Sequence, residues 1–280
     1  MNPSRRPYFE IANPELPRLL QSLPRDLDVL DVACGSGVHG AELKRLYGHR
    51  VIGVDLSALS IEKAKTRLAE AYVADITRPD LYPPLGRSKF DIIVLSDILE
   101  HVADPVDVLV RHLPFLAPGG YVLISLPNIA IWNVRLELLF GRFEYQDTGT
   151  LDRTHMRFFT RNSVRQFLAE AGLEVRDSRI TPGIARPFVP LIKKLYSQTS
   201  PGSPEDGDSS SIMDSSPYRF YMRWLYPLEH AICRLIPGLF AFQLITLAQP
   251  VAPQNGSLDP ELALPALAAA LERRTHDVHR

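Results

Sequence analysis

The residues best suited to chemistry in this chain begin with a carboxylate and a run of glycines. Asp31 lies near the end of the apolar, β-branched segment 28–32, and Gly35, Gly37 and Gly40 follow it. This pattern predicts a buried strand, a tight turn and then a helix. Because glycine lacks a Cβ, its backbone can approach a bound molecule closely. The sequence therefore predicts a small-molecule site directly after the first strand.

Two kinds of ligand fit this turn. The spacing Gly35-x-Gly37-x-x-Gly40 matches the dinucleotide fingerprint, and Asp55, about 20 residues further on, fits the acid that binds a ribose in that fingerprint. Asp31 favours a different ligand, because a carboxylate there would repel a pyrophosphate and attract a cation. S-adenosylmethionine has a ribose, an ammonium and a sulfonium but no phosphate, so it suits acids at both strand ends. The remaining alternative is that the glycine turn has a structural role only and binds no ligand.

The segments from about residue 28 to 126 resemble the class I S-adenosylmethionine-dependent methyltransferases. Asp31-x-Ala-Cys-Gly-Ser-Gly37 is similar to the first motif of that family, and 72–76 and 90–102 are similar to its third and fourth strands with their exits. The most specific segment is 116–125, in which a Pro-Gly-Gly turn opens the fifth strand. Together with Asp55, these segments make five matches in the order of the family, which weighs against a dehydrogenase.

The resemblance implies S-adenosyl-L-methionine as the cofactor and gives roles to individual residues. Asp55 would bind both ribose hydroxyls, and Asp75 would contact the adenine amino group. The full cofactor-binding set expected from the sequence is Asp31, Gly35, Gly37, Asp55, Leu56, Asp75, Ile76 and Ser96.

A second, narrower resemblance covers 141–149 and 151–160. These segments look like a subgroup of small-molecule methyltransferases that accompany surface-polysaccharide assembly and are distantly similar to the ubiquinone O-methyltransferases. The resemblance implies methylation of an oxygen on a small or lipid-linked acceptor, such as a sugar of a surface glycan. A quinone or polyketide-type hydroxyl, or an amine, is the alternative acceptor. A non-catalytic protein that only binds the cofactor is a further alternative.

Methyl transfer to oxygen needs an aligned acceptor and a group that removes its proton. Histidine suits this role because its pKa lies near neutral pH. His101 follows the fourth expected strand, and His155 lies in the segment that marks the subgroup, so both are candidate bases. Asp152, Glu100 or alignment alone are the other possibilities. We expect no metal, although Asp97, Glu100 and His101 could form a metal-assisted variant of the site.

Alternating strands and helices predict an α/β fold with a doubly wound, mostly parallel, Rossmann-like sheet of seven strands. The strands are expected near 28–32, 51–55, 71–74, 90–95, 120–126, 173–180 and 240–248, with the last one antiparallel. Helices are expected near 41–46 and 128–140, and over 163–172 with Asn162 or Ser163 as the cap and Gly172 as the stop. Ligands bind such sheets beyond the carboxyl ends of the strands, where the acids lie.

The chain is expected to divide into an N-terminal helical segment (1–27), a cofactor-binding core (28–180), an insertion (181–238), the last core strand (239–250) and a peripheral tail (251–280). Within the insertion, 198–217 lacks apolar residues and is expected to be disordered. Its flanks within 187–236 mix aromatic and basic residues on amphipathic stretches, which indicates a cap, a homodimer contact or peripheral membrane contact.

Composition is consistent with one large catalytic domain. The chain has 280 residues, of which 45% are hydrophobic, and a formal net charge of −1, so it has no overall basic character for nucleic acid. Its two cysteines lack metal-binding spacing, and residues 1–7 are polar, so we expect a cytoplasmic protein, with possible peripheral attachment at the inner face of the membrane.

Overall fold

The computed structural model describes residues 12–85, 89–188 and 219–251. Within these residues, seven strands form one sheet in the order β3-β2-β1-β4-β5-β7-β6. The strands are β1 (Asp28–Val32), β2 (Arg50–Asp55), β3 (Glu70–Val73), β4 (Phe90–Ser96), β5 (Leu116–Pro127), β6 (Leu173–Pro182) and β7 (Ala241–Pro250). The expected strands are thus all present, and β5 begins four residues earlier than its expected start.

The first five strands pair in parallel, with β1 at the centre between β2 and β4. The registers place Val32 beside Val54 on β2 and beside Leu95 on β4, so the carboxyl ends of these strands share one edge. The last strand, β7, runs antiparallel and lies between β5 and β6. The predicted fold class is confirmed.

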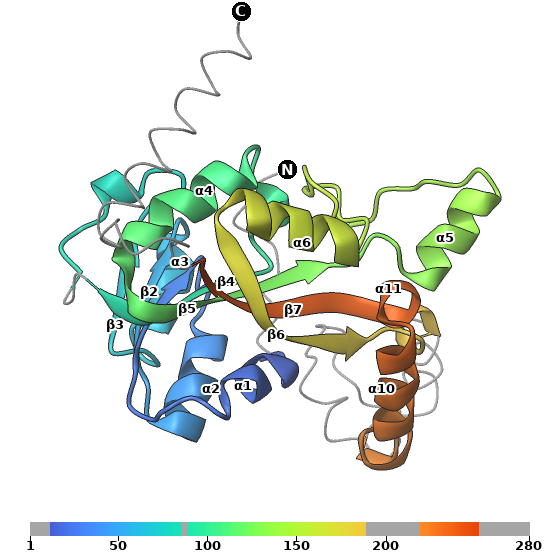
Figure 1. The fold of residues 1–280 in the computed structure, drawn as a ribbon, viewed down its shortest axis with the longest axis horizontal. Helices are drawn as coiled ribbons and strands as arrows, with labels where there is room; N and C mark the ends of the chain where they lie inside the picture. The colour runs from blue at the N-terminus through green and yellow to red at the C-terminus, as the bar shows by residue number, and fades with distance from the viewer. Residues whose placement is uncertain (1–11, 86–88, 189–218, 252–280) are drawn as a thin grey trace, which may run out of the picture. The chain divides into compact units, whose positions relative to one another are not determined.

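The helices connect these strands. They are α1 (Glu15–Leu20), α2 (Val38–Tyr47), α3 (Ala58–Ala64), α4 (Pro105–His112), α5 (Trp132–Leu139), α6 (Arg161–Glu170), α10 (Tyr226–Leu235) and α11 (Pro237–Phe240). Short turns of 3-10 helix are η2 (Pro79–Leu81), η3 (Leu99–His101), η4 (Leu113–Phe115) and η5 (Arg186–Phe188), and η6 (Tyr221–Leu225) is a π-helical turn. In Figure 1, α1 and α2 lie on one side of the sheet and α4 and α6 on the other.

Local sequence signals explain several helix ends. The Asp104 side chain caps α4 by accepting from the backbone N–H of Asp107, with Pro105 at the first helical position. Helix α6 corrects our expected cap, because it begins at Arg161 and its cap is Thr160. Thr160 and Ser163 form a reciprocal capping box, so Ser163 lies inside the first turn. Gly172 follows the helix end with a φ of +72°, as its expected stop role requires.

The chain divides into two compact units. Unit 1 contains 1–126, 154–179 and 245–280, and unit 2 contains 127–153 and 180–244. The core of unit 1 packs leucines of α1 and α2 against valines and isoleucines of the central strands. Unit 2 has its own small core, formed by Ile131, Val134, Leu151 and Phe242.

Some sequence-based expectations fall outside the described residues. These are the segment 1–11, the expected disordered stretch 198–217, the amphipathic flank at 189–196 and the tail from 252 onward. In the described part of the chain, no helix is both long and apolar enough to span a membrane.

Candidate functional site

The turn between β1 and α2 has the backbone conformation that its glycines permit. Gly35 and Gly37 have φ of +54° and +78°, and Ala33, just before them, has φ of +58°. Gly37 caps α2, where an added Cβ would lie 3.0 Å from Cγ of Leu68. The turn therefore places backbone without side chains at the carboxyl ends of the parallel strands. Ligands bind at this edge in sheets of this kind.

Asp31 lies beneath this turn and is only 3% exposed. Among the described residues, no group forms a hydrogen bond with its Oδ2 atom. Burial, and then the negative charge of Asp55, raise the pKa of Asp31 to about 7. A buried carboxylate oxygen without a partner is the group that a cationic ligand would satisfy.

Asp55 is the last residue of β2, and its carboxylate connects the turn after β1 with the loop after β2. Its Oδ2 accepts from the backbone N–H of Gly35 at 2.9 Å, and its Oδ1 accepts from that of Ser57 at 2.8 Å. Each carboxylate oxygen has a second lone pair, so both can still accept from the hydroxyls of a ribose. The side chain is 4% exposed and is held in place before any ligand binds.

The other expected cofactor residues lie at the exits of β2, β3 and β4. Leu56 is 71% exposed, whereas Ile76 is buried. Asp75 is exposed, and its Oδ1 accepts from both the backbone and the hydroxyl of Thr77. Ser96, at the end of β4, donates to Oδ2 of Asp97 at 3.2 Å. All of these positions belong to unit 1.

The sequence analysis missed His39 and the role of Asp97. His39 follows the glycine turn, and its Nε2 accepts from the backbone N–H of Asn13 at 3.1 Å. Burial lowers the pKa of His39, and the negative charge of Asp97 opposes part of this shift. Asp97 has a φ of +53° and accepts from the hydroxyl of Ser125 at 3.1 Å. The position of His39 between Gly37 and Gly40 was a signal that could have identified it.

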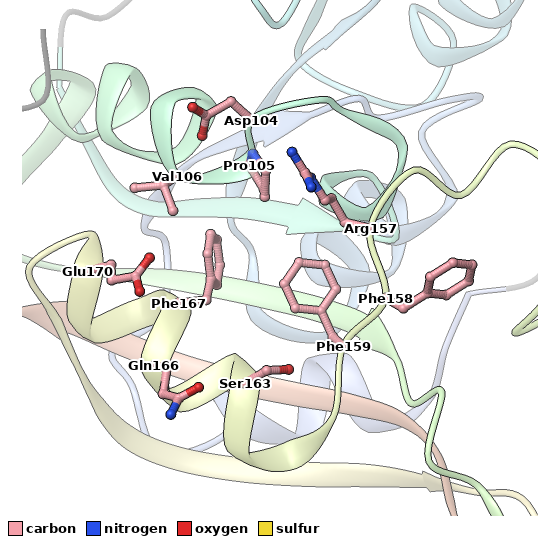
Figure 2. A pocket seen from close by; sticks show the side chains of 10 residues that line it. All are labelled: Asp104, Pro105, Val106, Arg157, Phe158, Phe159, Ser163, Gln166, Phe167 and Glu170. Atoms are coloured by element: carbon pink, nitrogen blue, oxygen red, sulfur yellow. The ribbon is translucent and has the colours of Figure 1, made fainter. Parts of the chain in front are cut away.

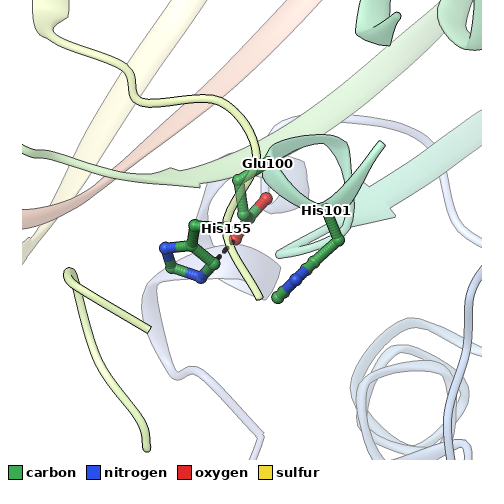
Figure 3. A group of neighbouring side chains, drawn as sticks. All are labelled: Glu100, His101 and His155. Atoms are coloured by element: carbon green, nitrogen blue, oxygen red, sulfur yellow. Dashed lines mark ion pairs between the residues drawn. The ribbon is translucent and has the colours of Figure 1, made fainter. Parts of the chain in front are cut away.

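The two candidate bases lie together in space around a buried carboxylate. His155 Nε2 is 4.0 Å from Oε1 of Glu100, and these side chains are 6% and 2% exposed. The rings of His101 and His155 meet edge to face, with 4.7 Å between their centroids. Figure 3 shows Glu100 and His101 coming from η3 and His155 from the segment that passes beside it.

Backbone hydrogen bonds hold that segment in place. The N–H groups of Met156 and Arg157 donate to the carbonyl of Glu100 at 2.8 and 3.1 Å. The guanidinium of Arg157 donates twice to the carbonyl of Ala103. Nδ1 of His101 lies 3.3 Å from the carbonyl of Thr154. Nδ1 also lies 3.2 Å from the hydroxyl oxygen of Thr154, so the backbone and the side chain of Thr154 both hold this ring.

Glu100, His101 and His155 each offer one ligand atom, and these atoms lie within 4.8 Å of one another. The metal-assisted alternative placed Asp97 in this set instead of His155. Asp97 is bonded to Ser96 and Ser125, and His155 takes its place in the cluster. An oxygen and two nitrogen donors suit a divalent cation in type.

A separate pocket of about 360 Å³ lies on unit 1 between the start of α4 and α6. Its apolar part includes Phe159 and Phe167, and Asp104, Arg157 and Glu170 also line it (Figure 2). It is lined by none of the expected cofactor residues, so it is distinct from the expected cofactor site at the strand ends.

Comparison with known proteins assigns the chain to a family. Residues 5–178 match the model of a family described as a methyltransferase domain. A ubiquinone biosynthesis O-methyltransferase of Caulobacter sp. (strain K31) is 30% identical over 154 residues, which are 53% of this chain and 60% of that protein. One of the same description from Cereibacter sphaeroides (strain KD131) is 28% identical over 64% of this chain and 74% of that protein. The match to the Caulobacter protein thus leaves more than a third of that relative's length uncovered.

Solved structures support the same fold at low identity. An S-adenosylmethionine-dependent methyltransferase from Methanosarcina mazei superposes with a TM-score of 0.51 at 18% identity, covering 85% of this chain and 98% of that one. The [4+2]-cyclase SpnF superposes with a TM-score of 0.50 at 17% identity, over 85% of this chain and 80% of that one. The unpartnered oxygen of Asp31 and the bare glycine turn fit the cationic methionine end of S-adenosylmethionine. The chain belongs to the methyltransferase-domain family and has the fold of the class I S-adenosylmethionine-dependent methyltransferases.

Proposed function

We propose that this enzyme methylates an oxygen atom of a small or lipid-linked acceptor, such as a sugar of a surface glycan. The observation that carries the proposal is the pairing of His155 with buried Glu100, 4.0 Å apart. An alcohol is a poor nucleophile until its proton is removed, so an oxygen acceptor needs such a base. The relatives described as O-methyltransferases of ubiquinone biosynthesis support oxygen as the acceptor atom.

In this proposal, the strand ends hold the cofactor. Asp31 takes the ammonium, because its buried Oδ2 needs a cationic partner. Asp55 accepts from the ribose hydroxyls while keeping its bonds to the Gly35 and Ser57 backbone. Asp75 uses Oδ1 for Thr77, which leaves Oδ2 for the adenine amino group. The bound cofactor supplies an electrophilic methyl group on a sulfonium.

His155 is the base, and Glu100 orients its ring and stabilises its charge after the proton arrives. Oε1 of Glu100, 4.0 Å from Nε2 of His155, is the counter-charge for the imidazolium that forms when the acceptor gives up its proton. The His101 ring, fixed by Thr154, packs edge-on against His155 and limits its rotation. The acceptor oxygen must then lie in line with the methyl–sulfur bond, because alignment supplies much of the rate.

A quinone or polyketide-type hydroxyl is the second candidate acceptor, and the ubiquinone-related relatives favour it. The base is the same in both cases, so the acceptor must be identified by labelling. Purified protein is incubated with S-adenosylmethionine carrying a labelled methyl group and with a lysate of its source organism. Label in an organic extract indicates a lipid-linked or quinone acceptor, and label in the aqueous phase indicates a soluble sugar. Label carried on a nitrogen atom of the product would refute the proposal.

The role of His155 has its own test. His155→Gln should lower the rate of methyl transfer about 10² to 10⁴-fold while leaving the affinity for S-adenosylhomocysteine unchanged. His101→Gln should lower the rate less, because this ring only positions the base. Equal rates in His155→Gln and the unaltered protein would remove His155 from the mechanism.

A chelator separates this mechanism from the metal-assisted one. The proposal expects full activity after treatment with EDTA. Loss of activity that Mg²⁺ or Zn²⁺ restores would instead make Glu100, His101 and His155 ligands of a cation.

A further inference from the structure

A stripe of large apolar side chains runs along η6 and α10 in unit 2. Trp224, Leu228, Ile232 and Leu235 are spaced by four, four and three residues, so they lie along one side of the helix. They are 62%, 60%, 40% and 81% exposed. We call these four residues the α10 stripe. The other described residues therefore leave much of the stripe uncovered.

Buried residues on the other side of α10 keep the stripe facing outward. Glu229 is 8% exposed and Cys233 is fully buried. The Glu229 carboxylate accepts from the backbone N–H of Ala185 at 2.9 Å and from the hydroxyl of Tyr221. Turning the stripe inward would expose apolar Cys233 and break both bonds of a buried acid, so the stripe is held outward.

Within residues 219–240, the exposed Lys, Arg, Asp and Glu side chains all carry a positive charge. Arg219, Arg223 and Arg234 are exposed, and Glu229, the one acid between residues 219 and 240, faces inward. Arg223 and Arg234 are eleven residues apart, about three helical turns, so they border the same side of the stripe. The guanidinium of Arg223 also lies over the Trp224 ring, 5.6 Å from its centroid. The exposed face of α10 is therefore both apolar and cationic.

We propose that the α10 stripe and its arginines dock the protein on an anionic lipid surface. An amphipathic helix with tryptophan and leucine on one face and basic residues beside it binds the interface of such a surface. A second copy of the chain fits less well. A two-fold dimer would place the same patch against itself and bring the arginines of both copies together with no exposed acid on this helix to pair them.

The inference extends the proposed function, because a lipid-linked acceptor would be found at the same surface. Its test needs neither acceptor nor turnover, so failure of the proposed function leaves it intact. The full chain is sedimented with vesicles of phosphatidylcholine alone or mixed with phosphatidylglycerol, at low and high salt. We expect binding to the anionic vesicles that weakens as salt screens the arginines.

Variants locate the contact. Leu228→Glu with Leu235→Glu, and separately Arg223→Glu with Arg234→Glu, should weaken binding at least about tenfold. Leu81→Glu is the matched control, since Leu81 is 66% exposed on unit 1 and should have no effect. Unchanged affinity for S-adenosylhomocysteine verifies that each variant folds.

A spectroscopic readout follows the helix directly. The chain has two tryptophans, so Trp132→Phe leaves Trp224 as the single reporter. Its emission should shift to shorter wavelength with anionic vesicles. Three results would overturn the proposal: no vesicle binding, binding that the stripe variants leave unchanged, or a dimer that Leu228→Glu dissociates, which would assign the stripe to a second copy.

Discussion

The ionisation of Asp31 should control the affinity for the cofactor. Its carboxyl is buried, and its pKa is raised from the usual 3.8 to about 7. To bind an ammonium it must lose its proton. Below pH 7 each pH unit should therefore cost about tenfold in affinity, so binding at pH 5 should be about a hundredfold weaker than at pH 8 or above. The full shift corresponds to roughly 4 kcal/mol of preference for the neutral acid in the empty site.

Isothermal titration with S-adenosylhomocysteine measures this directly. That ligand keeps the ammonium but lacks the methyl group, so nothing turns over. The Kd should fall with pH up to about 7 and then level off. Near pH 6 most of a proton should be released on binding, which the dependence of the heat on the ionisation enthalpy of the buffer reports.

The matched variant is Asp31→Asn, which keeps the shape and removes the titration. It should bind weakly at pH 8, and its Kd should barely depend on pH. In the absence of ligand, Asp31→Asn should also raise the free energy of unfolding more at pH 8 than at pH 5. With a raised folded pKa, the stability contributed by the neutral acid is present at low pH and is lost as pH rises through about 7. A Kd that is equal at pH 5 and pH 8 in the unaltered protein, or a pH slope that persists in Asp31→Asn, would refute the reasoning.

Four further predictions concern the loop, the core and a helix end. Asp55→Ala should abolish measurable binding of S-adenosylhomocysteine, because it removes the ribose acceptor and the acceptor of the Gly35 N–H; unchanged affinity would refute our placement of the site. Gly40→Ala should lower the free energy of unfolding by about 1–3 kcal/mol in urea titrations, because the new Cβ would lie 2.6 Å from a methyl of Leu68. Burial lowers the pKa of His112 to about 4, so its stability contribution is present above about 6.5 and is lost as pH falls toward 4; the stability difference between the unaltered protein and His112→Phe should shrink by roughly 3 kcal/mol over that range. Thr160→Ala should cost about 1 kcal/mol by opening the capping box of α6, with no effect on cofactor affinity.

The strands and the glycine turn could be predicted because their signals are local. β-branched residues followed by glycine determine a strand and its exit wherever the segment packs. The cap of α6 was misplaced because Thr160, Asn162 and Ser163 are all good capping residues. Only the observed hydrogen bonds show that Thr160 caps and that Ser163 completes the box.

The histidine cluster was only partly predictable. His101 and His155 were candidates by type, but they are 54 positions apart. Their contact depends on the backbone bonds from Met156 and Arg157 to the carbonyl of Glu100. No periodicity or composition signals such a long-range pairing of backbone groups. The place of His39 between Gly37 and Gly40 could have singled it out, but its hydrogen bond with Asn13, 26 positions earlier, is a long-range contact of the same kind.

The fold itself does not determine the reaction, because a [4+2]-cyclase shares it with a TM-score of 0.50. The residues that decide the chemistry must therefore be held by features outside the strand framework. Arg157 is such a feature, since its guanidinium anchors the segment of His155 to the Ala103 carbonyl. Arg157→Ala should loosen the segment of the proposed base, His155, and lower kcat about tenfold, with the Kd for S-adenosylhomocysteine unchanged.

Arg153→Ala is the control for this last variant, because Arg153 lies two residues from His155 but pairs with Asp147 in unit 2. It should leave kcat intact. A parallel loss of cofactor affinity would mean that Arg157 supports the fold of unit 1 as a whole. A loss confined to kcat would mean that the segment after residue 153 determines the reaction, and that the sheet edge where we propose the cofactor binds does not.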